Sequence, residues 1–411
     1  MKILLIHQNF PGQFPHLATS LAKRGHDVLA LTDRDNNKQT TTRTARYVFE
    51  KPVLDPKTPV LARTFAENAA RGEAVARACI ALRDKHSLKP DVVFGHIGWG
   101  ETLFLREVWP DARHLLYAEL FYRTRGLDTG FDPEFQKSDD WQRIRTTARQ
   151  AHLLLAMNCA DAALAPTRWQ ADSFPADLRS KITVVHDGID TTVVKPNPIA
   201  TVALPGTSLS LKAGDEILTF VNRNLEPYRG YHTFMRALPA VLAARPSAHV
   251  VIVGGDDVSY GTKPPGDTNW KTMFLDEVKD RLDLSRIHFV GKVPYPMFLD
   301  LMRVTRVHAY LTYPFVLSWS MLEAMSAGAL VIGSRTPPVE ELIQDGVNGR
   351  LVDFFDVPAW SAALAEALGE PRRFMSLREA ARRTIVERYD LKTKCLPAML
   401  AFVEGAQSTH A

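Results

Sequence analysis

Short apolar segments alternate with helical segments along this chain, and that alternation restricts the fold more than any other feature. Lys2–His7 has the pattern of an apolar strand, and Pro15–Lys23 follows it with the pattern of a helix. Gly25 lies at the end of that helix, and Val28–Leu31 has the pattern of the next strand. The same order begins again at Ile217–Val221. Because both halves share it, the sequence predicts α/β architecture built from two doubly wound domains.

The length of 411 residues is too great for a single compact core, so two domains are the natural expectation. The apolar fraction of 45% is ordinary for a soluble protein, and we find no apolar run long enough to span a bilayer. The three cysteines, Cys79, Cys159 and Cys395, are scattered, which argues against a disulfide framework and for a reducing compartment. The small net charge of +4 arises within residues 1–196, and this mildly basic half is compatible with an anionic acceptor or a membrane surface.

The stretch Tyr313–Gly346 predicts a loop, a short helix and a buried strand. Ser318 and Ser320 are both plausible N-caps of the helix, and Ala329–Ile332 is the apolar strand. A helix start offers free N–H groups and the positive end of a helix dipole, which suits a phosphate, and Glu323 could bind sugar hydroxyls. A capping box formed by Ser320 and Glu323 explains the same residues without any ligand.

Two arginines follow the first strand of the second half of the chain. Arg223 and Arg229 lie in the segment Asn222–Gly230, directly before a predicted helix at Tyr231–Ala243. Arginines in a loop after a strand are well suited to holding a diphosphate. An exposed basic loop without a ligand is the alternative.

Three features of the first half are typical of a ligand site at the carboxyl ends of strands. His96 follows the strand Pro90–Phe94, although a lone histidine is more often structural. Gly12 lies in the first loop, where a backbone can approach a substrate closely. Glu119 begins an aromatic and cationic loop, which is either an acceptor wall or a packed surface loop. No GxGxxG follows the first strand, which disfavours a nicotinamide site.

The stretch from Tyr313 resembles the donor-site signature of the retaining GT-B glycosyltransferases of family 4. The matching residues are Glu323, Ala324, Met325, Gly328, Glu341, Asp345, Gly346 and Gly349. The pattern departs at the first carboxylate, where Phe315 stands, and in the loop glycines, which are Val316 and Ser318 here. The resemblance implies a GT-B fold, in which two Rossmann-like domains face a central cleft, and Phe315 suggests an altered preference for the donor sugar.

We expect the acceptor-binding domain at 1–196, a linker rich in Pro, Ser and Thr at 197–214, and the nucleotide-sugar domain at 215–390. In the fold that the resemblance implies, the helix within 391–411 packs back on the first domain. The resemblance also implies roles for individual residues: His96 is the catalytic residue; Arg223, Arg229, Ser318, Trp319 and Ser320 bind the diphosphate; Glu323 binds the ribose; Lys292 and Val293 lie against the nucleobase; and Gly12, Glu119, Phe315, Val316 and Leu317 line the cleft for the donor sugar or acceptor.

The resemblance implies a retaining glycosyltransferase, with a hexosyltransferase favoured, that moves a sugar from a UDP- or GDP-linked donor to a hydroxyl acceptor. The acceptor would be a sugar, a lipid-linked sugar or a glycoside in glycan synthesis. We expect no metal, no further cofactor and no nucleic-acid partner, and a cytoplasmic protein for which peripheral membrane association at the inner face stays open. The alternatives are a sugar-nucleotide epimerase or hydrolase, and a non-catalytic scaffold that binds nucleotide sugars.

Overall fold

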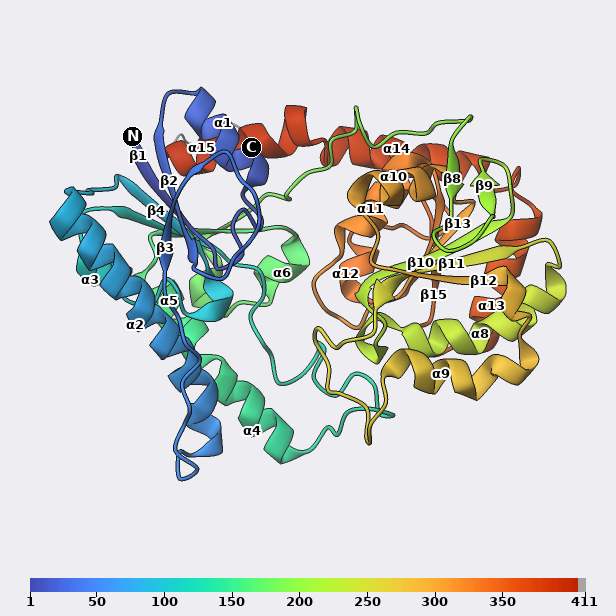
Figure 1. The fold of residues 1–411 in the computed structure, drawn as a ribbon, viewed down its shortest axis with the longest axis horizontal. Helices are drawn as coiled ribbons and strands as arrows, with labels where there is room; N and C mark the ends of the chain where they lie inside the picture. Colours follow the sequence, from blue (N-terminus) through green and yellow to red (C-terminus); the bar gives the residue numbers. More distant parts are fainter. Residues whose placement is uncertain (406–411) are drawn as a thin grey trace. The chain divides into compact units, whose positions relative to one another are not determined.

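The computed structural model describes residues 1–405, and the chain divides into two compact units. The first unit comprises Met1–Gly188 and the residues from Lys392 onward, and the second unit comprises Ile189–Leu391. Each unit is built on its own parallel sheet with helices on both faces (Figure 1). Within residues 1–405, no helix combines the length and the apolar character needed to cross a membrane. The two doubly wound domains expected from the sequence are confirmed.

The sheet of the first unit has seven parallel strands in the order β3-β2-β1-β4-β5-β6-β7. The strands are β1 (Lys2–Ile6), β2 (Asp27–Asp33), β3 (Arg43–Tyr47), β4 (Val92–His96), β5 (Arg113–Tyr117), β6 (Ala162–Ala165) and β7 (Ile182–Val184). β1 lies in the middle, where Ile3 pairs with Val28 on one side and Val92 on the other. All four apolar residues of β1 are buried, because helices cover both faces of the sheet.

Helices of the first unit cover the sheet from two sides (Figure 1). They are α1 (Pro15–Lys23), α2 (Val60–His86), α3 (Leu105–Val108), α4 (Asp140–Arg149), α5 (Ala151–Cys159), α6 (Arg168–Asp172), α7 (Ala176–Arg179) and α15 (Leu396–Glu404). α15 packs against α1, and Glu404 forms ion pairs with Arg24 and His26. Phe94 of the sheet contacts both Phe14 and Phe402. The last described helix therefore belongs to the first unit, and 406–411, which the expected segment 391–411 includes, lie outside the described residues.

The sheet of the second unit has six parallel strands in the order β12-β11-β10-β13-β14-β15. The strands are β10 (Ile217–Asn224), β11 (His249–Gly255), β12 (Ile287–Gly291), β13 (Val307–Tyr310), β14 (Leu330–Ser334) and β15 (Arg350–Val352). β10 and β13 pair in register at the centre, so the loops that follow them emerge at the same edge of the sheet. That edge carries the donor-site residues expected from the sequence.

Helices also cover both faces of the second sheet (Figure 1). They are α8 (Tyr231–Ala244), α9 (Trp270–Val278), α10 (Tyr295–Val304), α11 (Trp319–Ala327), α12 (Pro337–Glu340), α13 (Val357–Gly369) and α14 (Met375–Arg388). α8 packs against α9 and α13, while α11 packs against α10 and α14. Short 3₁₀ turns lie at Ile97–Trp99, Pro227–Arg229, Lys279–Arg281 and Leu284–Arg286, and a π-helical turn lies at Leu391–Cys395.

The segment 197–214, expected as a linker, is ordered and forms part of the second unit. β8 (Thr201–Ala203) and β9 (Ser210–Lys212) make an antiparallel hairpin. Val202, Leu204 and Leu211 are buried in the core of the second unit, together with residues of α10 and α11. The contacts divide the chain after Gly188 rather than after 196. The Pro- and Ser-rich composition concealed the alternation of buried and exposed positions in the two short strands.

The helical segment between Asp140 and Cys159 is divided at Gln150. α4 ends at Arg149 and α5 begins at Ala151, and the Gln150 side chain donates a hydrogen bond to the Tyr122 carbonyl oxygen at 2.7 Å. α4 carries exposed Trp141 and Ile144, whereas His152, Leu153, Ala156 and Met157 of α5 are buried. The two helices therefore have different surroundings.

Candidate functional site

Arg229 occupies the centre of the candidate donor site in the second unit. It ends the 3₁₀ turn after β10, and only 4% of its surface is exposed. Its Nη1 donates hydrogen bonds to Thr312 Oγ1 at 2.8 Å and to the Val316 carbonyl oxygen at 2.9 Å. These contacts tie the loop after β10 to the loop after β13. The buried Glu226 carboxylate interacts electrostatically with Arg229, so this edge of the sheet holds a buried cation near a buried anion.

Arg223 and Lys292 provide further positive charge from the ends of neighbouring strands. Arg223 lies near the end of β10 with its side chain exposed, and Lys292 directly follows β12. A Cβ added at Gly255 would lie 2.7 Å from the Lys292 Cε atom, so Lys292 passes close to the end of β11. Val293 is half-buried against the core of the second unit. Exposed cations near a buried one favour a polyanionic ligand.

The start of α11 lies beside this group of cations. Ser318 is the N-cap, and its Oγ accepts a hydrogen bond from Ser320 N at 3.3 Å. Tyr310 at the end of β13 fixes the loop by accepting a hydrogen bond from Ser318 N at 2.7 Å. Trp319 is 43% exposed, and Leu317 is half-buried. The capping box of Ser320 and Glu323 is not formed, because Ser320 lies inside the helix.

Glu323 is a buried carboxylate inside the first turns of α11. It accepts a hydrogen bond from the Tyr295 hydroxyl at 2.7 Å. Burial raises the pKa of Glu323, and the bond from Tyr295 works in the opposite direction. A half-satisfied carboxylate beside a helix N-terminus can accept further hydrogen bonds from a sugar hydroxyl pair.

Phe315 belongs to an aromatic cluster, which we define as Tyr228, Tyr260, Tyr313 and Phe315. The Phe315 ring lies 5.0 Å from that of Tyr260 and 5.1 Å from that of Tyr228. The Tyr313 ring lies 4.7 Å from that of Tyr228, tilted by 37°. The guanidinium carbon of Arg229 lies 4.9 Å from the Tyr260 ring and 5.6 Å from the Phe315 ring. Phe315 therefore contributes a cation–π contact to Arg229.

The anchor of the loop that carries Tyr260 was not found from the sequence. Glu226 is fully buried, and its carboxylate accepts hydrogen bonds from the backbone N–H groups of Ser259, Tyr260 and Gly261 at 2.9–3.2 Å. A carboxylate with three N–H partners is a strong, charge-assisted anchor. No local signal predicts it, because the partners are more than thirty positions apart and the bonds involve only backbone groups of the loop.

His96 lies at the carboxyl end of β4 in the first unit, where only 1% of its surface is exposed. Its Nδ1 accepts a hydrogen bond from Gly98 N at 2.9 Å, so the neutral ring carries its proton on Nε2. Nε2 lies 3.5 Å from Glu119 Oε2 without forming a hydrogen bond. Trp99 stacks on the ring at 4.1 Å and Tyr117 at 5.5 Å. These rings hold the imidazole in one orientation.

His7 is a second buried histidine at the same sheet edge, directly after β1. Its ring lies 5.8 Å from that of His96 and 5.1 Å from that of Trp99. A Cβ at Gly12 would lie 2.4 Å from the His7 ring, so the loop closes over it only because residue 12 is glycine. The sequence did not identify His7, although it shares with His96 the position of a polar residue ending an apolar strand.

Three histidines of the first unit share one local arrangement. His7, His96 and His186 lie at or just after the carboxyl ends of β1, β4 and β7. In each, Nδ1 accepts a hydrogen bond from the backbone N–H two residues later, at 2.9–3.0 Å. Burial lowers the pKa of His7 to about 3 and that of His186 to about 4. Both rings are therefore neutral near pH 7.

Unsatisfied polar atoms gather near His7 and His96. His7 Nε2, His96 Nε2 and Gln13 Oε1 are buried and form no hydrogen bond with residues 1–405. The other end of the Gln13 amide lies 3.5 Å from Glu119 Oε1. Buried polar atoms normally find partners, so their clustering favours a polar ligand or water here. The structure thus brings Gly12, His96 and Glu119 together at one edge of the first sheet, as the resemblance implied.

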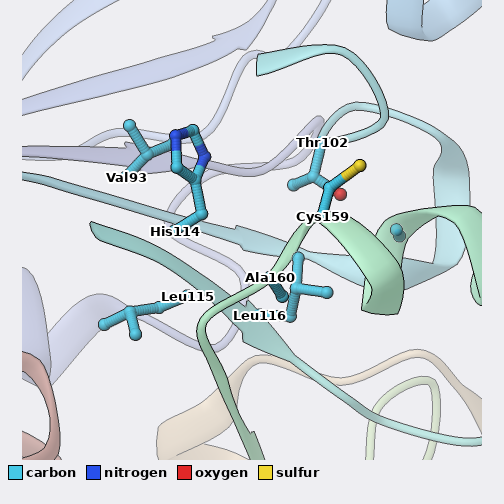
Figure 2. A pocket seen from close by; sticks show the side chains of 8 residues that line it. Val93, Thr102, His114, Leu115, Leu116, Cys159 and Ala160 are labelled. Atoms are coloured by element: carbon cyan, nitrogen blue, oxygen red, sulfur yellow. The ribbon is translucent and has the colours of Figure 1, made fainter. Parts of the chain in front are cut away.

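The first unit also contains a small cavity that is lined neither by the candidate donor-site residues nor by His7, His96 or Glu119. It lies among core residues of β4, β5 and α5, and Val93, Thr102, His114 and Cys159 are among the side chains that line it (Figure 2). Its volume of about 10 Å³ is at most that of one water molecule. It is too small for a sugar nucleotide.

Comparison with known families assigns both halves of the chain. Residues 24–194 match the family described as "Glycosyl transferase family 4 group", and residues 208–384 match "Glycosyl transferases group 1". Together the two matches cover most of the chain.

Relatives and solved structures agree with these matches. The chain is 23% identical to the glycogen synthase of Mycobacterium tuberculosis, over 96% of this chain and 92% of that protein. It is 26% identical to the D-inositol 3-phosphate glycosyltransferase of Thermobispora bispora, over 49% of this chain and 46% of that protein, so this second match spans about half of the relative's length. The crystal structure of Anabaena HepE in complex with UDP-glucose superposes with a TM-score of 0.65 at 15% identity, over 99% of this chain and 100% of that chain, which supports the fold.

The parallel sheets, the arginine and helix-start residues of the second unit and these matches agree, and the chain belongs to the family 4 glycosyltransferases of the GT-B fold.

Proposed function

We propose that this protein is a retaining hexosyltransferase that takes its sugar from a nucleotide-diphospho-sugar and transfers it to a hydroxyl acceptor in glycan synthesis. A UDP-linked sugar is the first candidate for the donor, supported by the structurally similar HepE, which was solved with UDP-glucose. The acceptor is proposed to be a sugar, a lipid-linked sugar or another glycoside.

The observation that carries the proposal is the buried Arg229 at the sheet edge where Arg223 is exposed. Burying a charge is costly unless an opposite charge compensates it. The hydrogen-bond and cation–π partners of Arg229 are neutral, and the Glu226 carboxylate, which interacts with its charge, is already bonded to three backbone N–H groups. A diphosphate would supply further negative charge at this edge of the sheet.

The chemistry requires stabilisation of a departing nucleoside diphosphate while an oxocarbenium-like sugar forms. Arg223, Arg229 and the free N–H groups at the start of α11 provide fixed positive potential for that leaving group. We propose that turnover therefore requires neither a divalent metal nor a further cofactor. Glu323 would accept hydrogen bonds from the ribose hydroxyls, while Lys292 and Val293 would lie against the nucleobase.

His96 is the proposed catalytic residue of the first unit. Its Nε2–H can donate a hydrogen bond to a hydroxyl of the donor sugar or of the acceptor, because Nδ1 is already occupied by Gly98. Glu119 and Gln13 offer acceptors beside it. The donor-site signature of the family has a carboxylate at the position of Phe315. We therefore propose that the donor sugar forms one hydrogen bond fewer with this position.

The test is calorimetric titration with UDP, GDP, ADP and dTDP, with and without magnesium. We expect one nucleotide to bind more tightly than the others and its affinity to be unchanged by magnesium. Arg223→Ala should weaken this affinity by about 1–3 kcal/mol, the range for a lost hydrogen bond to a charged group. Arg281→Ala is the matched control, because Arg281 is exposed in the same unit but lies in the turn after α9.

Turnover with the matching sugar nucleotide then separates transfer from the alternatives. Transfer to a sugar acceptor with a retained anomeric configuration, read by NMR, supports the proposal. Free sugar formed equally with and without acceptor would indicate a hydrolase, and binding without turnover would indicate a scaffold. Equal nucleotide affinity in wild type, Arg223→Ala and Arg229→Ala would refute the assigned donor site.

A further inference from the structure

The loop between β11 and α9, residues 256–269, is held by hydrogen bonds to Asn224 at the end of β10 and to Glu226 just after it. Besides the three bonds to the Glu226 carboxylate, the Asn224 amide donates to Ser259 Oγ at 2.8 Å. At the far end of the loop, Trp270 Nε1 donates to the Thr262 carbonyl oxygen at 2.8 Å. Most of the remaining loop residues are exposed. The loop is therefore held by a few discrete bonds rather than by a packed core.

Tyr260 is the residue that this loop places over Arg229. Its ring lies 4.9 Å from the guanidinium carbon, and its hydroxyl forms a side-chain hydrogen bond with Arg229. Tyr260 is 37% exposed, whereas Arg229 is 4% exposed. Phe315 lies nearby but is itself buried. Of the two rings that contact Arg229, only Tyr260 has solvent into which it can move.

Arg229 as a whole is 96% covered, so a diphosphate can reach its guanidinium group only if part of the cover moves. We infer that Tyr260 is a gate on Arg229: its ring and hydroxyl occupy the place that the diphosphate of the donor must take, and the loop held by Glu226 opens when donor binds. This inference rests on the proposed role of Arg229 in diphosphate binding. It adds that the resting protein holds its donor site closed through a contact inside the second unit.

If Tyr260 is a gate, removing its ring should change the diphosphate affinity in the opposite direction from that expected if Tyr260 were a ligand. If closed and open loops are in equilibrium, the apparent affinity for the diphosphate is reduced by the fraction of molecules that are closed. A cation–π contact of this kind corresponds to about a 2- to 30-fold bias toward the closed loop. Removing the Tyr260 ring should therefore tighten binding by about 2- to 30-fold. If Tyr260 were instead a ligand of the donor, the same change would weaken binding.

The experiment is titration of the full-length protein with inorganic pyrophosphate and with UDP. The variants are Tyr260→Ala, Tyr260→Phe, Arg229→Ala and the control Asp267→Asn, which alters an exposed position of the same loop. We expect Tyr260→Ala to bind pyrophosphate more tightly than wild type, Tyr260→Phe to be intermediate, and Asp267→Asn to equal wild type. Thermal melts verify that each variant is folded, and Tyr260→Phe keeps the test valid should Tyr260→Ala unfold.

Hydrogen exchange gives a second readout that does not depend on the affinity. In the resting protein the amides of 259–261 are bonded to Glu226. Opening of the loop breaks these bonds, so saturating pyrophosphate should speed exchange in the peptide that contains them. Slower exchange would show a loop that closes on its ligand and would overturn the inference.

The outcomes also separate this inference from the proposed function. Equal or weaker pyrophosphate binding by both Tyr260 variants, together with weaker binding by Arg229→Ala, overturns the gate and leaves the donor site standing. Unchanged binding in Arg229→Ala overturns the role of Arg229 and the gate with it. The absence of pyrophosphate binding in wild type and in Tyr260→Ala alike also overturns the gate.

Discussion

Acidification should destabilise the first unit through His7, and the magnitude follows from its burial. Burial lowers the pKa of folded His7 from 6.5 to about 3, and the neighbouring His96 adds to this effect. Between these two values only the unfolded chain binds the proton. The contribution of His7 to stability is therefore present above about pH 6.5 and is lost as the pH falls toward 3. From pH 7 to pH 5 the loss is about 2 kcal/mol, at 1.36 kcal/mol per pKa unit.

His7→Gln removes the titrating group and provides the measurement. Urea unfolding of both proteins at pH 7, 6 and 5 should show the stability advantage of wild type shrinking by about 2 kcal/mol across this range. Phe14→Leu is the control, because Phe14 contacts His7 but does not titrate, so its cost should be constant with pH. A wild-type advantage over His7→Gln that stays constant from pH 7 to pH 5 would refute the reasoning, because it would show that folded His7 accepts the proton.

Three further predictions concern the second unit. Gly230→Ala should destabilise by about 2–5 kcal/mol in thermal melts, because φ is +68° and the new Cβ would lie 2.3 Å from Leu311 Cβ; an unchanged Tm would contradict this. Tyr295→Phe should raise the pKa of Glu323 further, because it removes a hydrogen bond that stabilises the carboxylate. On acidification, nucleotide affinity should therefore fall at a higher pH than in wild type. Superimposable pH profiles of affinity would contradict this. Glu226→Gln should speed hydrogen exchange at 259–261, and unchanged exchange would show that the loop has another anchor.

Local signals in the sequence were sufficient for the strands and helices that position the sites. Pro15 begins α1 and Gly25 follows its end, as the pattern predicted. Ser318 caps α11 and Gly328 ends it in the left-handed conformation. Such signals act within a few residues, so they can be read without knowledge of the tertiary structure. The edge strand β3, with its half-exposed residues, lacked an apolar run and was not predicted.

The sequence alone did not predict the contacts between distant segments. The family resemblance drew attention to Phe315, but nothing indicated that Tyr260 from a loop insertion would lie against it. Glu226 looked like one more loop carboxylate, and its burial depends on the fold of residues 259–261. His7 was counted as the end of a strand, and its closeness to His96 follows only from the pairing of β1 with β4. The contacts of these residues depend on the tertiary fold and the strand order, not on neighbouring residues in the sequence.

The shared turn of His7, His96 and His186 occupies the same ring nitrogen in each histidine. Each Nδ1 accepts a backbone hydrogen bond, so only Nε2 is left for other groups, as an N–H whenever the ring is neutral. Such groups identify lone pairs by direction rather than by charge, and dissolved salt does not screen them as it screens arginine and phosphate. Ionic strength therefore distinguishes the two proposed sites: raising it should weaken the binding of a diphosphate to the arginines but leave hydrogen bonds donated by these histidines unchanged.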